Sequence, residues 1–147
     1  MEKKSEYAIA QFHNGFNCAQ SVLSAFANEL NMGEEQLLKI ACGFGAGMGR
    51  NEEVCGAVSG GIMVIGLKYG KSVCEDNGAM DKTYQLTRSL MKRMREKHGT
   101  YLCKVLLNGC DLKTEQGQKE FREKDMKTNI CIPCIRSAID FLEKETA

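Results

Sequence analysis

The sequence predicts an all-α fold: a single-domain helical bundle with a buried, glycine-rich central helix. Apolar residues recur at helical spacing along most of the 147 residues, and no stretch sustains the alternation typical of a strand. The hydrophobic fraction of 43% is enough to build a core. There is no Pro-rich or Ser-rich linker and no internal repeat, so we expect one domain over residues 1–147.

The first third of the chain predicts three helices. Residues 5–13 place their apolar side chains on one stripe. A second helix follows Asn17, which together with Gln20 has the spacing of a capping box, and it should continue to about residue 31. A third helix is expected over residues 34–42, with its leucines on the buried side.

Glycines dominate the next segment, because nine of the fifteen lie between residues 43 and 70. The alternating glycines of residues 43–50 predict a loop, since they favour neither helix nor strand. Residues 54–69 predict a helix that is apolar on all sides and therefore central and buried. Each glycine in this helix costs roughly 1 kcal/mol against alanine. Close helix approach through Gly56 and Gly60, or approach of the backbone to a bound group, would offset that cost.

Four more helical segments follow. The longest spans residues 79–97, with four side chains expected near the core: Tyr84, Leu90, Met91 and Met94. A short helix covers residues 101–107 and ends at an Asn-Gly pair typical of a C-cap. Residues 114–124 predict a polar surface helix, and the last helix runs from about 133 to 145.

Charge and hydropathy exclude some classes of partner. Twenty basic and nineteen acidic residues give a net charge of +1, which offers no overall attraction for nucleic acid or an anionic membrane. The longest uncharged run, residues 54–67, is too short to span a bilayer. The N-terminus lacks the apolar region of a signal peptide, so we expect a cytoplasmic protein.

Eight cysteines are the feature that needs a function. In a reducing compartment such thiols are more often catalytic, redox-cycling or metal-binding than structural disulfides. The alternative is a set of inert buried thiols that pack as small hydrophobes.

Four of the cysteines are predicted at helix starts: Cys18, Cys55, Cys103 and Cys131. Unpaired N–H groups and a partial positive charge at a helix N-terminus stabilise a thiolate, which is the nucleophile in disulfide exchange and the species that binds metals. Cys131 and Cys134 also form a C-x-x-C with proline in third place, similar to the thioredoxin motif but without the preceding strand. One such motif also supplies half of a tetrahedral zinc or cluster site.

Three segments carry a resemblance to a known family: Asn-Cys-Ala-Gln at 17–20, Gly-Ala-Gly-Met-Gly-Arg at 45–50 and Cys-Gly-Ala-Val-Ser-Gly at 55–60. They resemble the C_GCAxxG_C_C family of redox-active proteins, which is recognised by four cysteines and a C-G-A-x-x-G motif. Residues 103–109 resemble its third cysteine block and Cys131 its fourth, so the resemblance spans residues 17–142. It implies that the functional set is Cys18, Cys55, Cys103 and Cys131.

The other cysteines look like additions of this member: Cys42, Cys74, Cys110 and Cys134. The resemblance leads us to expect an aromatic or aliphatic core residue at position 134. Cys134 is therefore either a resolving thiol or core packing, with packing favoured. We keep Cys134 and Cys110 as secondary redox candidates.

We expect a redox protein, and as an enzyme a thiol-dependent oxidoreductase, that uses the four cysteines for thiol–disulfide exchange or electron transfer with a redox partner. Cys55 should be the most reactive thiolate and Cys18 or Cys103 its resolving partner. Four glycines should lie near this site: Gly45, Gly47, Gly49 and Gly56.

Two alternatives remain open. The same four cysteines could form a metal-binding module that holds zinc or an iron–sulfur cluster. The chain could also be a non-catalytic bundle that binds a small ligand or a partner, with the glycine-rich helix as the packing surface of a homodimer.

Overall fold

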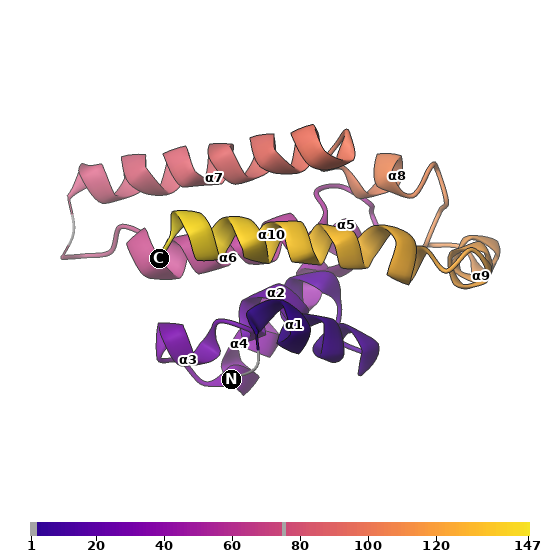
Figure 1. Cartoon of the computed structure of the whole chain (residues 1–147), viewed down its shortest axis with the longest axis horizontal. Helices are drawn as coiled ribbons and strands as arrows, with labels where there is room; N and C mark the ends of the chain where they lie inside the picture. Colours follow the sequence, from indigo (N-terminus) through magenta and orange to yellow (C-terminus); the bar gives the residue numbers. More distant parts are fainter. Residues whose placement is uncertain (1–2, 75) are drawn as a thin grey trace.

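The computed structural model describes residues 3–74 and 76–147, and its regular elements in these ranges are helices (Figure 1). The only strand-like pairing between described residues is an isolated antiparallel bridge between Val54 and Leu102. The predicted all-α fold class is therefore confirmed. Within the same ranges, every helix is too short or too polar to cross a membrane.

A central helix organises the bundle. α6 (Gly56–Tyr69) packs against α2 (Cys18–Ser24), α7 (Asn77–His98) and α10 (Ile132–Glu145). In Figure 1, α7 and α10 run lengthwise beside α6, and the N-terminal helices lie on its other side. Residues 56–61 of α6 are buried, whereas Leu67 near its end is 45% exposed. The prediction of a buried, glycine-rich central helix holds for the first two thirds of α6.

The glycines of α6 allow its neighbours to approach closely. A Cβ atom built on Gly60 would lie 2.7 Å from the carbonyl oxygen of Ala19, and one on Gly56 would lie 3.0 Å from the Ala19 nitrogen. On another face, a Cβ on Gly61 would meet the Leu90 side chain at 2.7 Å. Close helix packing, one of the two explanations expected from the sequence, therefore applies to these glycines.

The N-terminal helices form as predicted, except that one of them is interrupted. In the capping box, the Gln20 N–H donates to Asn17 Oδ1 at 2.9 Å and the Asn17 N–H donates to Gln20 Oε1 at 3.0 Å. α1 (Lys4–His13) and α4 (Glu34–Ala41) match the expected segments. The expected single helix after residue 17 is wrong, because α2 stops at Ser24 and the short α3 (Ala27–Leu30) follows.

The segment predicted as a loop forms two helical turns instead. A 3-10 turn, η1 (Cys42–Phe44), leads into α5 (Gly45–Met48), where the Gly49 N–H donates to the Gly45 carbonyl at 2.9 Å. Five consecutive residues have positive φ angles between 53° and 71°: Ala46, Gly47, Met48, Gly49 and Arg50. This is a left-handed turn, which the chain can form because alternate positions are glycine.

The left-handed turn holds strained residues. Each L-residue in a left-handed helix costs roughly 1–2 kcal/mol, and Ala46, Met48 and Arg50 have this conformation. Gly47 is required for packing as well, because a Cβ there would lie 2.5 Å from the Glu52 Cα atom. Such strain persists only where the surrounding structure enforces it.

Replacing Met48 with glycine should raise the free energy of unfolding by about 1 kcal/mol, because glycine removes the left-handed strain. Met48 is 39% exposed, so little packing is lost. Met80 is equally exposed, at 38%, but lies in the right-handed α7, so Met80→Gly should lower stability by about 1 kcal/mol. Thermal denaturation of both variants tests this, and destabilisation by Met48→Gly would contradict it.

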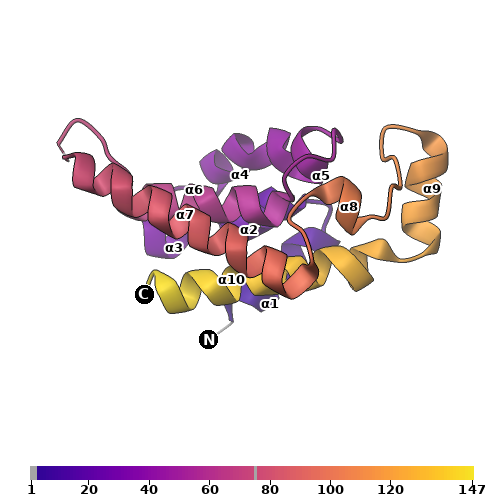
Figure 2. The same ribbon diagram turned by 90° about the horizontal axis from the view of Figure 1, so that it is seen from above.

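The second half of the chain forms the predicted helices, but one end of α7 extends beyond its neighbours. α7 begins after the N-cap Asp76 and ends at Gly99, and its N-terminal end reaches beyond the other helices in Figure 2. For this reason Tyr84, expected near the core, is 55% exposed, whereas Leu90 and Met94 are buried. α8 (Cys103–Leu106) and α9 (Glu115–Glu123) follow, with α9 at the opposite end of the molecule.

The last helix has an unexpected beginning. A π-helical turn, η2 (Lys127–Cys131), runs directly into α10, and Cys131 has right-handed helical dihedrals. Cys131 directly precedes α10, as the sequence predicted, but the π-helical turn before it means that this helix start is not open. Pro133 lacks an N–H and cannot donate to the carbonyl four residues earlier, so the change of helical register falls beside it.

Candidate active site

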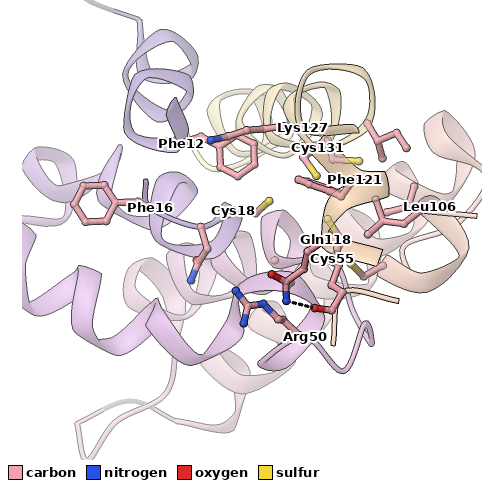
Figure 3. A pocket seen from close by; sticks show the side chains of 18 of the residues that line it. Phe12, Phe16, Cys18, Arg50, Cys55, Leu106, Gln118, Phe121, Lys127 and Cys131 are labelled. Carbon is pink, nitrogen blue, oxygen red and sulfur yellow. Dashed lines mark hydrogen bonds between the residues drawn. The ribbon is translucent and has the colours of Figure 1, made fainter. Parts of the chain in front are cut away.

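A cavity of ≈ 380 Å³ lies where α2, α6, α8, α9 and α10 meet (Figure 3). Five cysteines from four segments line it: Cys18, Cys55, Cys103, Cys131 and Cys134. The set contains all four cysteines predicted from helix position and from the family resemblance. Cys134, which the sequence favoured as core packing, is the fifth.

Short local structures place the first three of these cysteines. Cys18 is the first residue of α2, directly after the Asn17 cap, and Cys55 is the N-cap of α6. The Cys55 N–H donates to the Tyr101 carbonyl at 2.8 Å, and the Cys103 N–H donates to the Glu53 carbonyl at 2.7 Å. This short antiparallel contact fixes the start of α8 beside the start of α6.

The cavity brings Cys55 and Cys134 into a hydrogen-bonded pair. The pKa of Cys55 is lowered, first by the hydrogen bond with Cys134 and then by the backbone N–H groups of Ala57 and Val58, against burial. The pKa of Cys134 is raised by the same hydrogen bond and by burial. The shifts in pKa therefore favour the thiolate at Cys55 and the thiol at Cys134. The partner of Cys55 is Cys134, whereas the sequence led us to expect Cys18 or Cys103.

Cys18 and Cys131 form a second pair. A hydrogen bond with Cys131 is the largest cause that raises the pKa of Cys18, followed by burial and by the charges of the neighbouring sulfurs. Cys18 is only 8% exposed, whereas Cys131 is half-buried. Burial also raises the pKa of Cys103, as do the charges of Cys55 and Cys131. The cavity sulfurs therefore lie close enough for the charge of one to raise the pKa of another.

The remaining cysteines lie outside the cavity. Cys42 and Cys74 are exposed. Cys110, a secondary redox candidate, is buried in a separate apolar cluster with Leu107 and Leu112, where its Sγ donates to the Gly117 carbonyl at 3.0 Å. Burial raises the pKa of Cys110. Cys110 thus lies outside the cavity lining but close to it, because Cys103 packs against the same cluster and the charge of Cys110 contributes to the raised pKa of Cys103.

The left-handed turn forms part of the cavity wall. Gly56 lines the cavity together with Ala46 and Arg50, while Gly45 and Gly49 line a smaller adjoining hollow. Gly47 is buried against Glu52 and lines neither of them. Of the four glycines expected near the site, Gly56 therefore lines the cavity itself. The other three lie in the left-handed turn or directly before it, and this turn contributes Ala46 and Arg50 to the cavity wall.

Glu52 supports the turn from inside the protein. It is 5% exposed, and its Oε1 accepts a hydrogen bond from the Leu112 N–H at 2.8 Å, whereas Oε2 has no partner among the described residues. The Glu52 charge also contributes to the raised pKa of Cys103. Sequence reasoning missed this buried carboxylate, which nothing in its local pattern distinguishes from the exposed Glu53.

Aromatic and basic side chains complete the cavity, and they were not predicted. Phe12 and Phe16 come from the N-terminal segment, and α9 contributes three residues: Gln118, Phe121 and Arg122. In Figure 3, Lys127 lies beside Phe12, and Arg50 lies near Gln118. α9 is thus more than a surface helix. Its spacing gave no signal, because Phe121 is its single aromatic residue.

The described side chains do not form a ready metal centre. Within residues 3–74 and 76–147, no group of three or more His, Cys, Asp or Glu side chains is arranged to hold a metal ion.

The fold and the cavity together define an all-helical protein with cysteines that converge on one small-molecule-sized site. The family model described as "Putative redox-active protein (C_GCAxxG_C_C)" matches residues 16–145, which is nearly the whole chain. The chain belongs to this family, as the resemblance of its motifs predicted. No curated protein and no solved structure matches it.

Proposed function

We propose that this protein is a thiol–disulfide oxidoreductase in which Cys55 is the nucleophile and Cys134 the resolving thiol. The observation that carries the proposal is the pairing of thiols on one cavity wall, with Cys55 the sulfur whose pKa is lowered. The membership of the chain in a family described as redox-active supports it. A thiolate is required for attack on a disulfide, and Cys55 is the cavity thiol whose pKa is lowered toward that state.

The reaction follows from these two sulfurs. The Cys55 thiolate attacks one sulfur of a substrate disulfide and forms a mixed disulfide, while the other substrate sulfur leaves as a thiolate and takes up a proton. Cys134 then loses its proton and attacks Cys55 Sγ, which releases the second substrate thiol. The substrate gains two electrons and two protons, and the protein retains a Cys55–Cys134 disulfide.

The second pair supplies a route for reduction of this disulfide. Cys18 and Cys131 face the same cavity, and Cys131 is the more exposed of the two. Their dithiol can exchange with the Cys55–Cys134 disulfide and become oxidised in its place. An external dithiol reductant, the redox partner in this proposal, then restores them. We place the protein in the cytoplasm, where such reductants keep thiols reduced.

Oxidation followed by linkage mapping tests the proposal. The reduced protein, purified without oxygen, is treated with a limiting amount of a small disulfide and digested, and the linkages are identified by mass spectrometry. We expect Cys55–Cys134 first and Cys18–Cys131 at higher oxidant. Cys42→Ser, which changes an exposed thiol outside the cavity, should give the same pattern.

Two results would contradict the proposed pairing or function. A Cys131–Cys134 linkage in the C-x-x-C as first product would overturn the assignment of Cys134 to Cys55. Stoichiometric zinc or iron in the anaerobic protein, together with cavity thiols that do not react, would favour the metal-binding alternative.

A further inference from the structure

The cavity carries positive charge that the protein does not neutralise. Arg50, Arg122 and Lys127 line it, and none of the described residues that line it is an aspartate or glutamate. Within the described part of the chain, none of the three cations forms an ion pair. Their charge is therefore available to a ligand.

The three cations neither pair with the nearby carboxylates of α9 nor lower the pKa of Cys55. On α9, Glu120 pairs with Lys124 at 2.7 Å and Glu123 pairs with Lys119 at 3.9 Å, so both are engaged away from Arg122. Hydrogen bonds, not charges, are the causes that lower the pKa of Cys55. Among the described residues, the three basic side chains thus form no ion pair, and the thiol reaction proposed above does not use them.

Apolar side chains line the cavity together with the three cations. Four apolar residues, Phe12, Phe16, Phe121 and Ile130, line the cavity together with Leu106 of α8 and Leu107 directly after it. The Lys127 Nζ lies 4.6 Å from the centre of the Phe12 ring, so the charge stands over an aromatic face. A volume of ≈ 380 Å³ lies in the range of small-molecule sites.

We infer that the substrate is a small disulfide that bears carboxylate or other anionic groups on an apolar, preferably aromatic, body. The inference rests on the proposed function and specifies its substrate class. Arg122, Lys127 and Arg50 bind the anionic groups, the phenylalanines contact the apolar body, and the disulfide reaches Cys55. Charge-assisted hydrogen bonds to guanidinium groups give such a ligand both affinity and orientation.

A matched pair of aromatic disulfides tests the inference. Dithiobis(nitrobenzoate) carries two carboxylates and dithiodipyridine is neutral, and both release coloured thiols. Initial rates with each reagent are measured under anaerobic conditions with the full chain carrying Cys42→Ser and Cys74→Ser, because these two exposed thiols would otherwise react as well. We expect the ratio of anionic to neutral rates to fall about threefold to tenfold in Arg122→Gln and in Lys127→Gln. This rate ratio should fall further in the double variant, and in the wild type it should decline with added salt.

Control variants separate charge from structure. Lys119→Gln removes a cation of α9 that pairs with Glu123 and does not line the cavity, so the ratio should not change. Arg122→Lys keeps the charge and should retain most of the ratio. The helical circular dichroism spectrum of each variant reports its fold.

The outcomes distinguish the inference from the proposed function. Equal rate ratios in the wild type and in the Arg122 and Lys127 variants would overturn the substrate class while the exchange reaction stands. If Lys119→Gln lowered the ratio as much as Arg122→Gln, general charge rather than the cavity would be responsible, which also overturns it. If neither disulfide reacted at Cys55, the proposed function itself would fail.

Discussion

Replacing Cys55 with serine should lower the rate of disulfide reduction at least about a thousandfold, because a hydroxyl at this position is not ionised and is a far weaker nucleophile. The wild-type rate should persist to lower pH than that of an ordinary thiol with a pKa of about 8.5, because the pKa of Cys55 is lowered. The rate should decrease only as pH falls through that lowered value and protonates the thiolate. Turnover with an external dithiol reductant, followed from acidic to alkaline pH, measures both effects.

Cys134→Ser provides the informative companion to this variant. It keeps the nucleophile and removes the resolving thiol, so a single substrate equivalent should react and remain attached to Cys55 as a mixed disulfide. Intact mass spectrometry detects this adduct. Cys42→Ser, on the surface, is the control and should turn over as the wild type does. Normal turnover by Cys55→Ser would rule out the assigned nucleophile.

Replacing Gly60 with alanine should lower the free energy of unfolding by about 2 kcal/mol relative to Gly66→Ala in the same helix. Both substitutions gain the same helix propensity, roughly 1 kcal/mol, so their difference isolates packing. A Cβ at position 60 would lie 2.7 Å from a backbone oxygen of α2, whereas position 66 has open space within 4 Å. Because that contact is with backbone, α2 and α6 must separate to relieve it.

Denaturant unfolding of the two variants measures this difference. Gly66→Ala should be as stable as the wild type or more stable. A difference of 2 kcal/mol corresponds to roughly 4–8 °C in melting temperature for a chain of this size. Equal stability of the two variants would show that the contact between α2 and α6 relaxes without cost.

Most of the helical architecture could be predicted because it depends on local signals. Apolar periodicity predicted the helices, and the Asn17 cap needs only the residue three positions later. The left-handed turn was missed because the same glycine pattern is compatible with many loop conformations. Its choice depends on the buried Glu52 and on packing against residues far along the chain. Tyr84 was misplaced because periodicity defines a face of α7 but not how far the partner helices extend.

Four of the cysteines that line the cavity could be predicted from the sequence, but their contacts could not. The positions of Cys18, Cys55 and Cys103 at helix starts follow from local sequence, so helix position and family motif select the same residues. The pairing of Cys55 with Cys134 depends on the register of α10 after the π-helical turn, which no local pattern encodes. The aromatic and basic lining comes from α1, α9 and the turns beside them, and only the tertiary structure brings these together.

In the proposed mechanism, the electrostatic influence between the two thiol pairs couples their redox steps. The charge of Cys55 contributes to the raised pKa of Cys18, and the charge of Cys131 contributes to that of Cys134. Oxidation of Cys55 and Cys134 to a disulfide removes the first of these charges, so it favours ionisation of Cys18 and primes the second pair. Under the proposed mechanism the molecule would then store four electrons, and its two reduction potentials would depend on each other.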